Sequence, residues 1–262
     1  MSLGGPLSRR ILGRRHSALL VAIVITFAVR PLFGDGEAAR IVFSVAVLLL
    51  LLVALYATQV DDLVGEREVL LGQRRRRQFI GWALAVPAIV ERLYAILTTS
   101  PRSLLAGSIC WLVFFAFITW SHLRTLLRHR EVTSETIAMS VSIYLLLGLT
   151  WGMLYILIFQ VHPEAFSFGG VSTAAVSPDQ PNIFPVFIYF SLTTLSTIGF
   201  GDITPMTLQA RYAAVAEGIT GQFYLAILVA RLVGMQMSSA THSGSTNPAR
   251  AVEPEASLER EQ

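Results

Sequence analysis

Long apolar runs recur along this chain of 262 residues, and they restrict it to a membrane fold. A helix needs about 20 residues to cross the hydrocarbon core of a bilayer. Six runs approach or exceed that length: 17–33, 39–58, 79–97, 103–121, 136–159 and 208–235. A seventh apolar run, 184–196, is too short, since about 13 residues of helix rise only about 20 Å. We therefore expect an all-α membrane protein with six transmembrane helices and a re-entrant helix between the fifth and the sixth.

The composition agrees with a membrane protein and leaves little room for a soluble domain. Hydrophobic residues make up 53% of the chain and charged residues only 14%, whereas soluble domains carry about 25% charged residues. All the basic residues are arginines. They lie in short segments beside the apolar runs rather than in one patch, so we expect no nucleic-acid binding. Cys110 is the only cysteine, which excludes an intrachain disulfide.

The arginines also predict an orientation, because basic residues concentrate in cytoplasmic loops. Arginines are frequent before the first run, between the second and third runs, and between the fourth and fifth runs. Six crossings with both termini in the cytoplasm fit this alternation. We predict four parts and one exposed outer loop: a cytoplasmic segment 1–16, a four-helix membrane domain 17–130, a second membrane domain 131–237, a disordered cytoplasmic tail 238–262, and the loop 161–183.

A non-helical stretch follows the short apolar run at membrane depth. Such a stretch must be buried in protein or line a water-filled path, because lipid cannot satisfy its backbone groups. It reads Thr-Ile-Gly-Phe-Gly-Asp over residues 197–202. Gly199 and Gly201 can take backbone conformations that are closed to other residues, so that successive carbonyl oxygens face one axis. A ladder of carbonyl oxygens of this kind can replace the water around a dehydrated cation.

This segment resembles the selectivity filter of the potassium channel superfamily, whose pattern is Thr-x-Gly-Tyr/Phe-Gly-Asp. The resemblance covers 137–235, because Asp202, Pro205 and a glycine within the last apolar run also occupy family positions. It implies that 131–237 is a pore domain, with a pore helix and a selectivity-filter loop before the inner helix. The residues that it assigns to potassium binding are Thr197, Ile198, Gly199 and Phe200, through their carbonyls and the Thr197 hydroxyl. Gly201 completes the filter, and Ser196 and Asp202 support it.

The resemblance also implies an assembly and a transport activity. The chain carries one copy of the motif, so four copies are needed to close a ring, and we expect a homotetramer. The helix 184–196 would direct the negative end of its dipole at the ion path, which favours a cation. We therefore expect passive potassium transport across the plasma membrane. The expected partners are potassium ions, the lipid bilayer and the other subunits, with no cofactor and no chemical catalysis.

Several residues of the last apolar run are further candidates for a role in the pore. Gly218 or Gly221 is a candidate gating hinge, although glycines also let transmembrane helices approach closely. Glu217 is expected to brace the pore helix or to tune cation occupancy. Gln222 is expected to face the central cavity, as are Ala226 and Val229 if the helix phase follows the family.

The sequence gives weaker support for a functional role of charged residues elsewhere in the chain. The fourth run carries no arginine, so we expect no voltage sensing through that helix. Glu91 and Arg92 lie within the third run, where an ordinary structural ion pair or snorkelling is the simpler reading. His162 and Glu164 in the outer loop are candidates for sensing external pH, or are solvated side chains.

Three other functions are compatible with parts of this sequence. Residues 199–202 also spell the Gly-x-Gly-Asp signature of intramembrane aspartyl proteases. Those enzymes need a second aspartate within a spanning helix, and the remaining aspartates lie in loops or at the ends of runs. A non-conducting membrane scaffold and a weakly selective cation channel are the other two alternatives.

Overall fold

The computed structural model describes residues 15–34, 36–64, 71–97, 104–128, 133–169 and 183–244. Its long helices are α2 (Arg15–Phe33), α3 (Glu37–Val64), α4 (Leu71–Leu97), α5 (Leu104–Arg128), α6 (Ser134–Val161), α7 (Ile183–Leu195) and α8 (Leu208–Gly244). A 3-10 turn, η3 (Pro163–Ala165), and two short strands, β1 (Phe166–Phe168) and β2 (Ile203–Pro205), complete the described chain. The predicted helical membrane fold is therefore confirmed.

Five of the described helices are long and apolar enough to cross a bilayer. The apolar spans are 16–33, 41–58, 105–128, 134–161 and 208–231. The third predicted crossing is also a helix, α4, but its uninterrupted apolar part is only 78–90. Charged residues cause this difference, since α4 begins with four arginines at 74–77 and carries Glu91 and Arg92 near its end. The protein is thus a multi-pass membrane protein, and six crossings remain a prediction.

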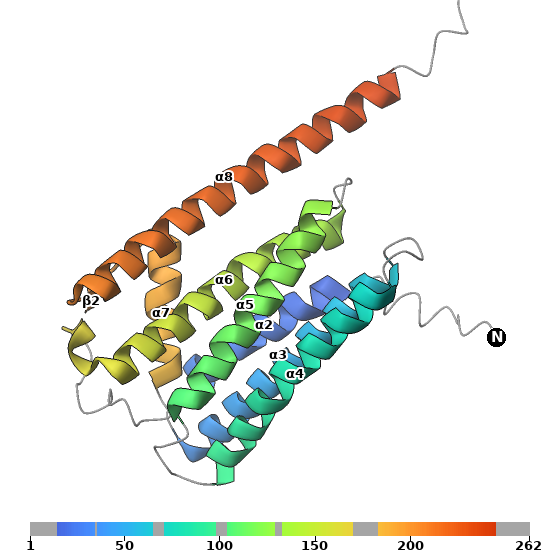
Figure 1. Cartoon of the computed structure of the whole chain (residues 1–262). Helices are drawn as coiled ribbons and strands as arrows, with labels where there is room; N and C mark the ends of the chain where they lie inside the picture. The colour runs from blue at the N-terminus through green and yellow to red at the C-terminus, as the bar shows by residue number, and fades with distance from the viewer. Residues whose placement is uncertain are drawn as a thin grey trace, which may run out of the picture.

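The helices form a bundle from which α8 stands apart. Figure 1 shows α2 to α6 side by side, with the short α7 between α6 and α8 at one end of the bundle. Both α2 and α5 pack along α6, and α7 packs against α6 and α8. Side chains with no exposed surface fill the spaces between the helices of the bundle, among them Ile23 of α2, Phe114 of α5 and Leu146 of α6. Helices α2 and α5 therefore rest on α6 of their own chain, and α3 and α4 pack against α2 and α5.

A carboxylate ties the start of α2 to the start of α6. Glu135 accepts hydrogen bonds from the Ser17 hydroxyl at 2.5 Å and from the backbone amides of His16 at 3.1 Å and Ser17 at 3.4 Å. The first amides of a helix have no partner within the helix, and they carry its positive dipole end. Glu135 thus satisfies amides of α2 and anchors the N-terminal helix to the predicted pore domain.

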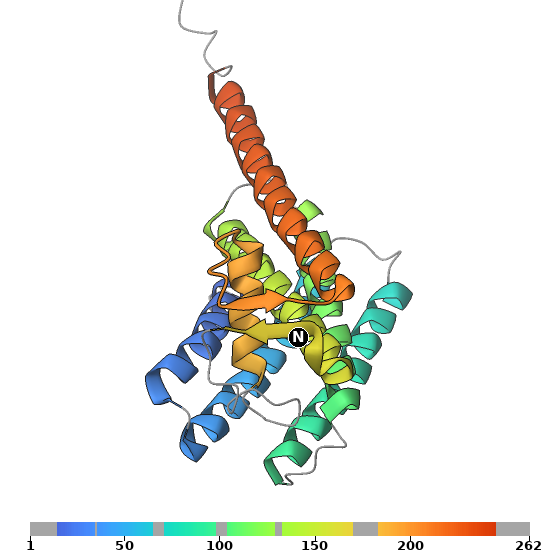
Figure 2. The same ribbon diagram turned by 90° about the vertical axis from the view of Figure 1, so that its left-hand side faces the viewer.

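The segment after α6 differs from the exposed loop that the sequence predicts. Strand β1 pairs antiparallel with β2, with Phe166 opposite Pro205, and Figure 2 shows the two strands beside the start of α8. Phe166 is buried against Tyr155, Phe187 and Phe190, with ring centroids 4.9–5.8 Å apart. The alternation Phe-Ser-Phe explains the strand, because it places Phe166 inside and Ser167 outside. The part of the predicted loop from 170 to 182 lies outside the described residues.

The predicted disordered tail begins too early. Helix α8 continues through 238–244 and ends at Gly244. This stretch contains no proline, the strongest helix breaker, and the first proline beyond α8 is Pro248. The rest of that tail, and all but the last two residues of the predicted N-terminal segment 1–16, lie outside the described residues. The boundary between the two membrane domains remains a prediction.

Candidate functional site

The short helix α7 is held close to α6 by two glycines. A Cβ atom on Gly152 would lie 2.5 Å from Cδ1 of Ile188 and 3.3 Å from the backbone oxygen of Phe187. A Cβ atom on Gly148 would lie 2.7 Å from Cδ2 of Leu192. The spacing Gly-x-x-x-Gly is the sequence signal for such a close helix pair, and neither glycine is among the site residues predicted from the sequence. These glycines set how deeply α7 sits in the fold.

The predicted filter begins by folding back onto the last turn of α7. The amide of Thr197 donates to the carbonyl of Thr194 at 3.0 Å. The amides of Ile198 and Gly199 both donate to the carbonyl of Thr193, at 2.8 and 3.1 Å. In a trans peptide unit the N–H and the preceding C=O point in opposite directions. The carbonyls of Ser196, Thr197 and Ile198 therefore point away from the carbonyls of α7 that hold the segment.

Every second residue of the segment has a left-handed backbone. The angle φ is 59° at Thr197, 52° at Gly199 and 79° at Gly201. No neighbouring atom lies within 4 Å of a Cβ built on Gly199 or Gly201, so these positions need glycine for its backbone and not for space. Thr197 takes the same left-handed conformation although it is β-branched, which is unusual. The sequence predicts the two glycines and gives no signal for this conformation at Thr197.

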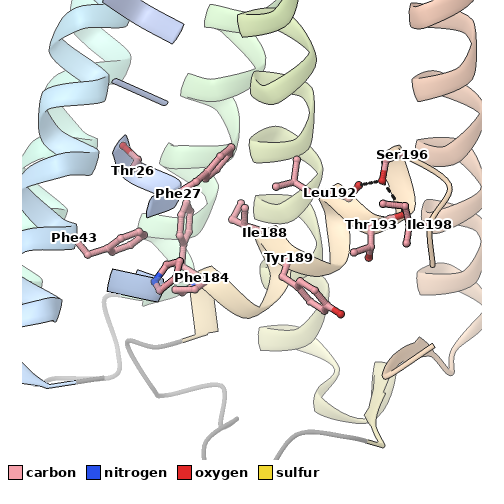
Figure 3. A pocket seen from close by; sticks show the side chains of 12 residues that line it. Thr26, Phe27, Phe43, Phe184, Ile188, Tyr189, Leu192, Thr193, Ser196 and Ile198 are labelled. Atoms are coloured by element: carbon pink, nitrogen blue, oxygen red, sulfur yellow. Dashed lines mark hydrogen bonds between the residues drawn. The ribbon is translucent and has the colours of Figure 1, made fainter. Parts of the chain in front are cut away.

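The two large filter side chains lie on the α7 side but remain mostly exposed in one chain. Ile198 borders a cavity of about 370 Å³ between α7 and the helices α2 and α3, together with Phe43, Ile188 and Leu192. Figure 3 shows this arrangement. Phe200 stacks on Tyr189 of α7, with centroids 6.2 Å apart and rings 3° from parallel. Even so, Ile198 is 59% and Phe200 67% exposed.

The backbone after the predicted filter is hydrogen-bonded to the segment that follows α6. The carbonyl of Asp202 accepts from the Gly169 amide at 2.9 Å, and the Met206 amide donates to the Ala165 carbonyl at 2.8 Å. The Asp202 carboxylate accepts from the next amide, that of Ile203, at 3.0 Å. These bonds continue the β1–β2 pairing on both sides, so they couple the C-terminal end of the predicted filter to this small sheet.

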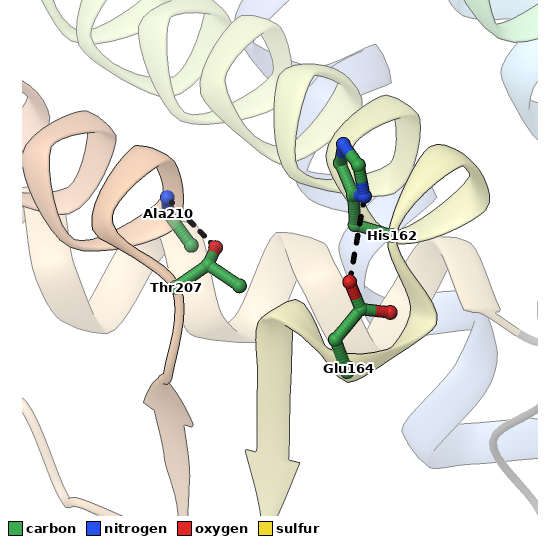
Figure 4. Close-up of polar contacts among 4 residues, drawn as sticks. All are labelled: His162, Glu164, Thr207 and Ala210. Atoms are coloured by element: carbon green, nitrogen blue, oxygen red, sulfur yellow. Dashed lines mark hydrogen bonds and ion pairs between the residues drawn. The ribbon is translucent and has the colours of Figure 1, made fainter.

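The start of α8 lies at the same end of the molecule as the two candidate pH-sensing residues. Figure 4 shows Thr207, whose hydroxyl accepts from the Ala210 amide at 3.4 Å and caps the first turn of α8. It also shows His162 beside Glu164, with Nδ1 and Oε1 3.4 Å apart. Both of these side chains are more than half exposed. Their arrangement is that of a surface pair, and a pH-sensing role remains a prediction.

The candidate residues of α8 fall into two groups. Gly221 lies against the end of α7, since a Cβ atom there would be 2.3 Å from the Leu195 carbonyl oxygen. Gly218 is less crowded, with the Thr194 carbonyl oxygen 3.9 Å from such an atom. Gln222 lies beside the filter and donates through Nε2 to the Thr197 hydroxyl at 3.4 Å. Close packing therefore explains Gly221, and the hinge remains a prediction.

Glu217 is fully buried between three helices. Its carboxyl group contacts the Tyr155 hydroxyl of α6 at 2.5 Å and the Ser191 hydroxyl of α7 at 2.5 Å. Ser191 in turn contacts the Gly148 carbonyl of α6 at 2.7 Å. Of the two roles considered for Glu217, this geometry fits bracing of the pore helix. The sequence offers no signal for Tyr155 and Ser191 as its partners.

The other candidate residues take no part in this cluster. Ala226 and Val229 are exposed on α8 in the single chain. The side chains of Glu91 and Arg92 lie outside the described part of the molecule. Helix α5 carries no charged residue before Arg124, and the lack of voltage sensing through it remains a prediction.

Comparisons with known proteins match this chain to ion channels. A family model described as "Ion channel" matches residues 140–237. Protein LctB of Bacillus caldotenax is 33% identical over 90 residues, which cover 34% of this chain and 64% of that protein. Potassium channel protein kcv of Paramecium bursaria Chlorella virus 1 is 32% identical over 75 residues, covering 29% and 77%. Two-pore potassium channel 4 of Arabidopsis thaliana is 35% identical over 74 residues, covering 26% of each chain. No solved structure gives a significant match.

Proposed function

Because the chain belongs to the pore-loop superfamily of potassium channels, we propose that four copies surround one pore and conduct potassium ions selectively and passively. This superfamily consists of ion channels and not enzymes, which decides against the intramembrane protease. The conserved chemistry of such a pore is the replacement of the water around the ion by protein oxygens. The proposal assigns that task to the carbonyls of Thr197, Ile198, Gly199 and Phe200 and to the Thr197 hydroxyl.

The backbone of the filter segment is the observation that carries this proposal. Three of its amides donate back to α7, so the carbonyls of Thr197 and Ile198 are directed away from that helix. The alternating left-handed residues Thr197, Gly199 and Gly201 are what a row of carbonyls on one side of a chain requires. The Thr197 hydroxyl donates to the Ser196 carbonyl at 2.7 Å, which leaves its oxygen lone pairs available to a cation or to Gln222.

The surface of a single chain supports assembly into a tetramer. Ile198 and Phe200 of the filter are largely exposed, although both are apolar. Helix α8 presents a further exposed stripe at helical spacing, formed by Tyr212, Val215, Ile219 and Phe223. In a membrane protein such a surface meets either lipid or another subunit, and its position beside the filter favours another subunit. Neighbouring subunits that cover these residues would complete the ring of which one chain supplies a quarter.

The proposal extends to location and orientation. The arginine distribution supports cytoplasmic termini, with the filter segment and the β1–β2 sheet on the opposite side of the membrane. We place the channel in the plasma membrane of a bacterial cell, because the chain contains no lysine, as expected for a GC-rich genome. Potassium ions and the bilayer are its only proposed ligands.

Potassium and sodium flux into liposomes that contain the purified protein tests the proposal. Gly199→Ala forces a Cβ atom onto a left-handed backbone, which costs about 1–2 kcal/mol per residue, and four subunits add this cost at one ring of carbonyls. We expect selective potassium flux in the wild type and its loss in Gly199→Ala. Gly234→Ala is the matched control, since it lies on α8 with no atom within 4 Å of the new Cβ.

Each contrary outcome points to one of the alternatives. Equal potassium and sodium flux in the wild type would indicate a weakly selective cation channel. Absence of flux over a range of membrane potentials and pH values would count for a non-conducting scaffold. Flux that survives Gly199→Ala unchanged would contradict the assigned filter.

A further inference from the structure

Three close oxygen contacts around Glu217 require three hydrogen atoms. The contacts join Tyr155 to Oε2 of Glu217 at 2.5 Å, Ser191 to Oε1 of Glu217 at 2.5 Å, and Ser191 to the Gly148 carbonyl at 2.7 Å. A hydroxyl group has one hydrogen, so Tyr155 and Ser191 supply two. The carbonyl of Gly148 can only accept. The third hydrogen must therefore be on Glu217.

A neutral carboxylic acid satisfies every contact in turn. Tyr155 donates to Oε2, the protonated Oε1 donates to the Ser191 hydroxyl oxygen, and Ser191 donates to the Gly148 carbonyl. An ionised Glu217 would instead leave two of the acceptors sharing one hydrogen of Ser191. It would also place a charge on a side chain that is 0% exposed, with no ion pair to it among the described residues. Burying an unpaired charge is far more costly than burying a hydrogen-bonded neutral acid.

We propose that Glu217 is a neutral acid that positions the pore helix, and that its proton links α8 through Ser191 to α6. Ser191 lies on α7 two residues before Thr193 and three before Thr194, whose carbonyls hold the amides of the filter segment. A displacement of Ser191 therefore displaces the anchor of the filter. Glu217 touches no permeating ion in this arrangement and acts only through α7. The effect on conduction rests on the proposed channel function, whereas the protonation state does not.

Infrared difference spectroscopy tests the proton directly. The carboxylic-acid C=O band of the wild-type protein at neutral pH should lose one component in Glu217→Gln. Glu135→Gln is the matched control, because the contacts of Glu135 are all with donors: one hydroxyl and two amides. Its replacement should therefore leave the acid band unchanged. An acid band that is the same in the wild type and in Glu217→Gln would overturn the proposal.

Ion flux tests the positioning role. Glutamine offers the same pattern as the neutral acid, an N–H toward Ser191 and an oxygen toward Tyr155, so Glu217→Gln should keep wild-type flux and potassium selectivity. Glu217→Ala removes both contacts and should lower selective flux by about tenfold or more. Tyr155→Phe, which removes the hydroxyl that contacts Glu217, should also lower selective flux. Tyr224→Phe is its control, because the Tyr224 hydroxyl also joins α8 to α6, at 2.7 Å to the Ser140 carbonyl, and its side chain packs in a separate cluster with Met139 and Ile143 of α6.

The outcomes separate this proposal from the proposed function. If Glu217→Gln is as defective as Glu217→Ala, a negative charge is needed there and the neutral acid is wrong. If the wild type has no flux, the proposed function fails, and the infrared comparison still decides the protonation state.

Discussion

At the scale of single residues, the filter and its surroundings depend on two different properties of glycine. Gly199 and Gly201 supply left-handed backbone where there is open space for a side chain. Gly221 supplies space, because the Leu195 carbonyl oxygen occupies the position of a side chain. The two kinds of site therefore respond differently to the same substitution. Alanine changes the filter conformation in the first case and the distance between α7 and α8 in the second.

Gly221→Ala and Gly218→Ala separate packing from hinge motion. At Gly221 the new methyl group must push against backbone, so we expect a loss of about 1–3 kcal/mol of stability from overpacking. At Gly218 the nearest neighbour is 3.9 Å away, and the change should be neutral or slightly stabilising. Thermal unfolding in detergent measures both. Equal stability of the two variants would contradict the packing role, and loss of gating in Gly218→Ala with unchanged stability would support the hinge.

The sequence predicts the parts of this site that depend on local spacing and misses the contacts between residues that are distant along the chain. The spacing of Gly199 and Gly201 is local, so it predicts the alternating backbone. The partners of Glu217 lie 62 and 26 positions away along the chain, and no local pattern joins them. Thr197 has the left-handed φ because it ends α7 in a Schellman motif, in which its amide donates to the Thr194 carbonyl and the Ile198 amide to the Thr193 carbonyl. Glycine or asparagine usually marks that position, so a threonine there gives no signal in the sequence.

At the scale of helices and strands, the apolar runs predict where helices lie, whereas charged residues do not mark where helices end. The predicted short helix 184–196 is observed as Ile183–Leu195, and the last apolar run begins at the predicted residue, Leu208. The arginines at 74–77 are predicted to lie in a loop, yet they form the first turns of α4. Arginine favours helix, so a charged segment beside a membrane can continue one. The strands β1 and β2 have three residues each, too few for a period to be visible in the sequence.

Close packing between α6 and α7 gives a prediction at this scale. Gly152→Ala brings the new Cβ against Cδ1 of Ile188 and also against backbone atoms of Phe187 and Ile188, whereas Gly148→Ala meets only side-chain atoms of Leu192 and Leu195. A leucine side chain can change rotamer and backbone cannot. We therefore expect Gly152→Ala to cost about 1–3 kcal/mol and to lower potassium selectivity, and Gly148→Ala to have the smaller effect. Thermal unfolding measures the loss of stability and liposome flux the loss of selectivity. Larger losses in Gly148→Ala than in Gly152→Ala would contradict this account of the contact.

At the scale of the whole molecule, the exposed faces divide into lipid-facing and subunit-facing surfaces. Lipid is as apolar as leucine, so exposure of an apolar side chain does not by itself distinguish them. The position of a surface distinguishes the two kinds, because only the filter and α8 lie beside the central axis of the proposed tetramer. Helix α3 carries equally exposed leucines on the far side of α2 and α6. The exposed faces of α8 and α3 are therefore both apolar, but we expect a neighbouring subunit to cover the first and lipid to cover the second.

Paired alanine substitutions on the two faces test this division. Ile219→Ala with Phe223→Ala removes large side chains from the exposed stripe of α8, where they are 52% and 63% exposed in one chain. Leu49→Ala with Leu52→Ala removes comparable side chains from α3, each 48% exposed. Van der Waals packing drives helix association in membranes, so the α8 pair should shift tetramer toward monomer while the α3 pair leaves the tetramer intact. Native mass spectrometry of the detergent-solubilised protein reports the populations, and an equal effect of both pairs would place the subunit interface elsewhere than along α8.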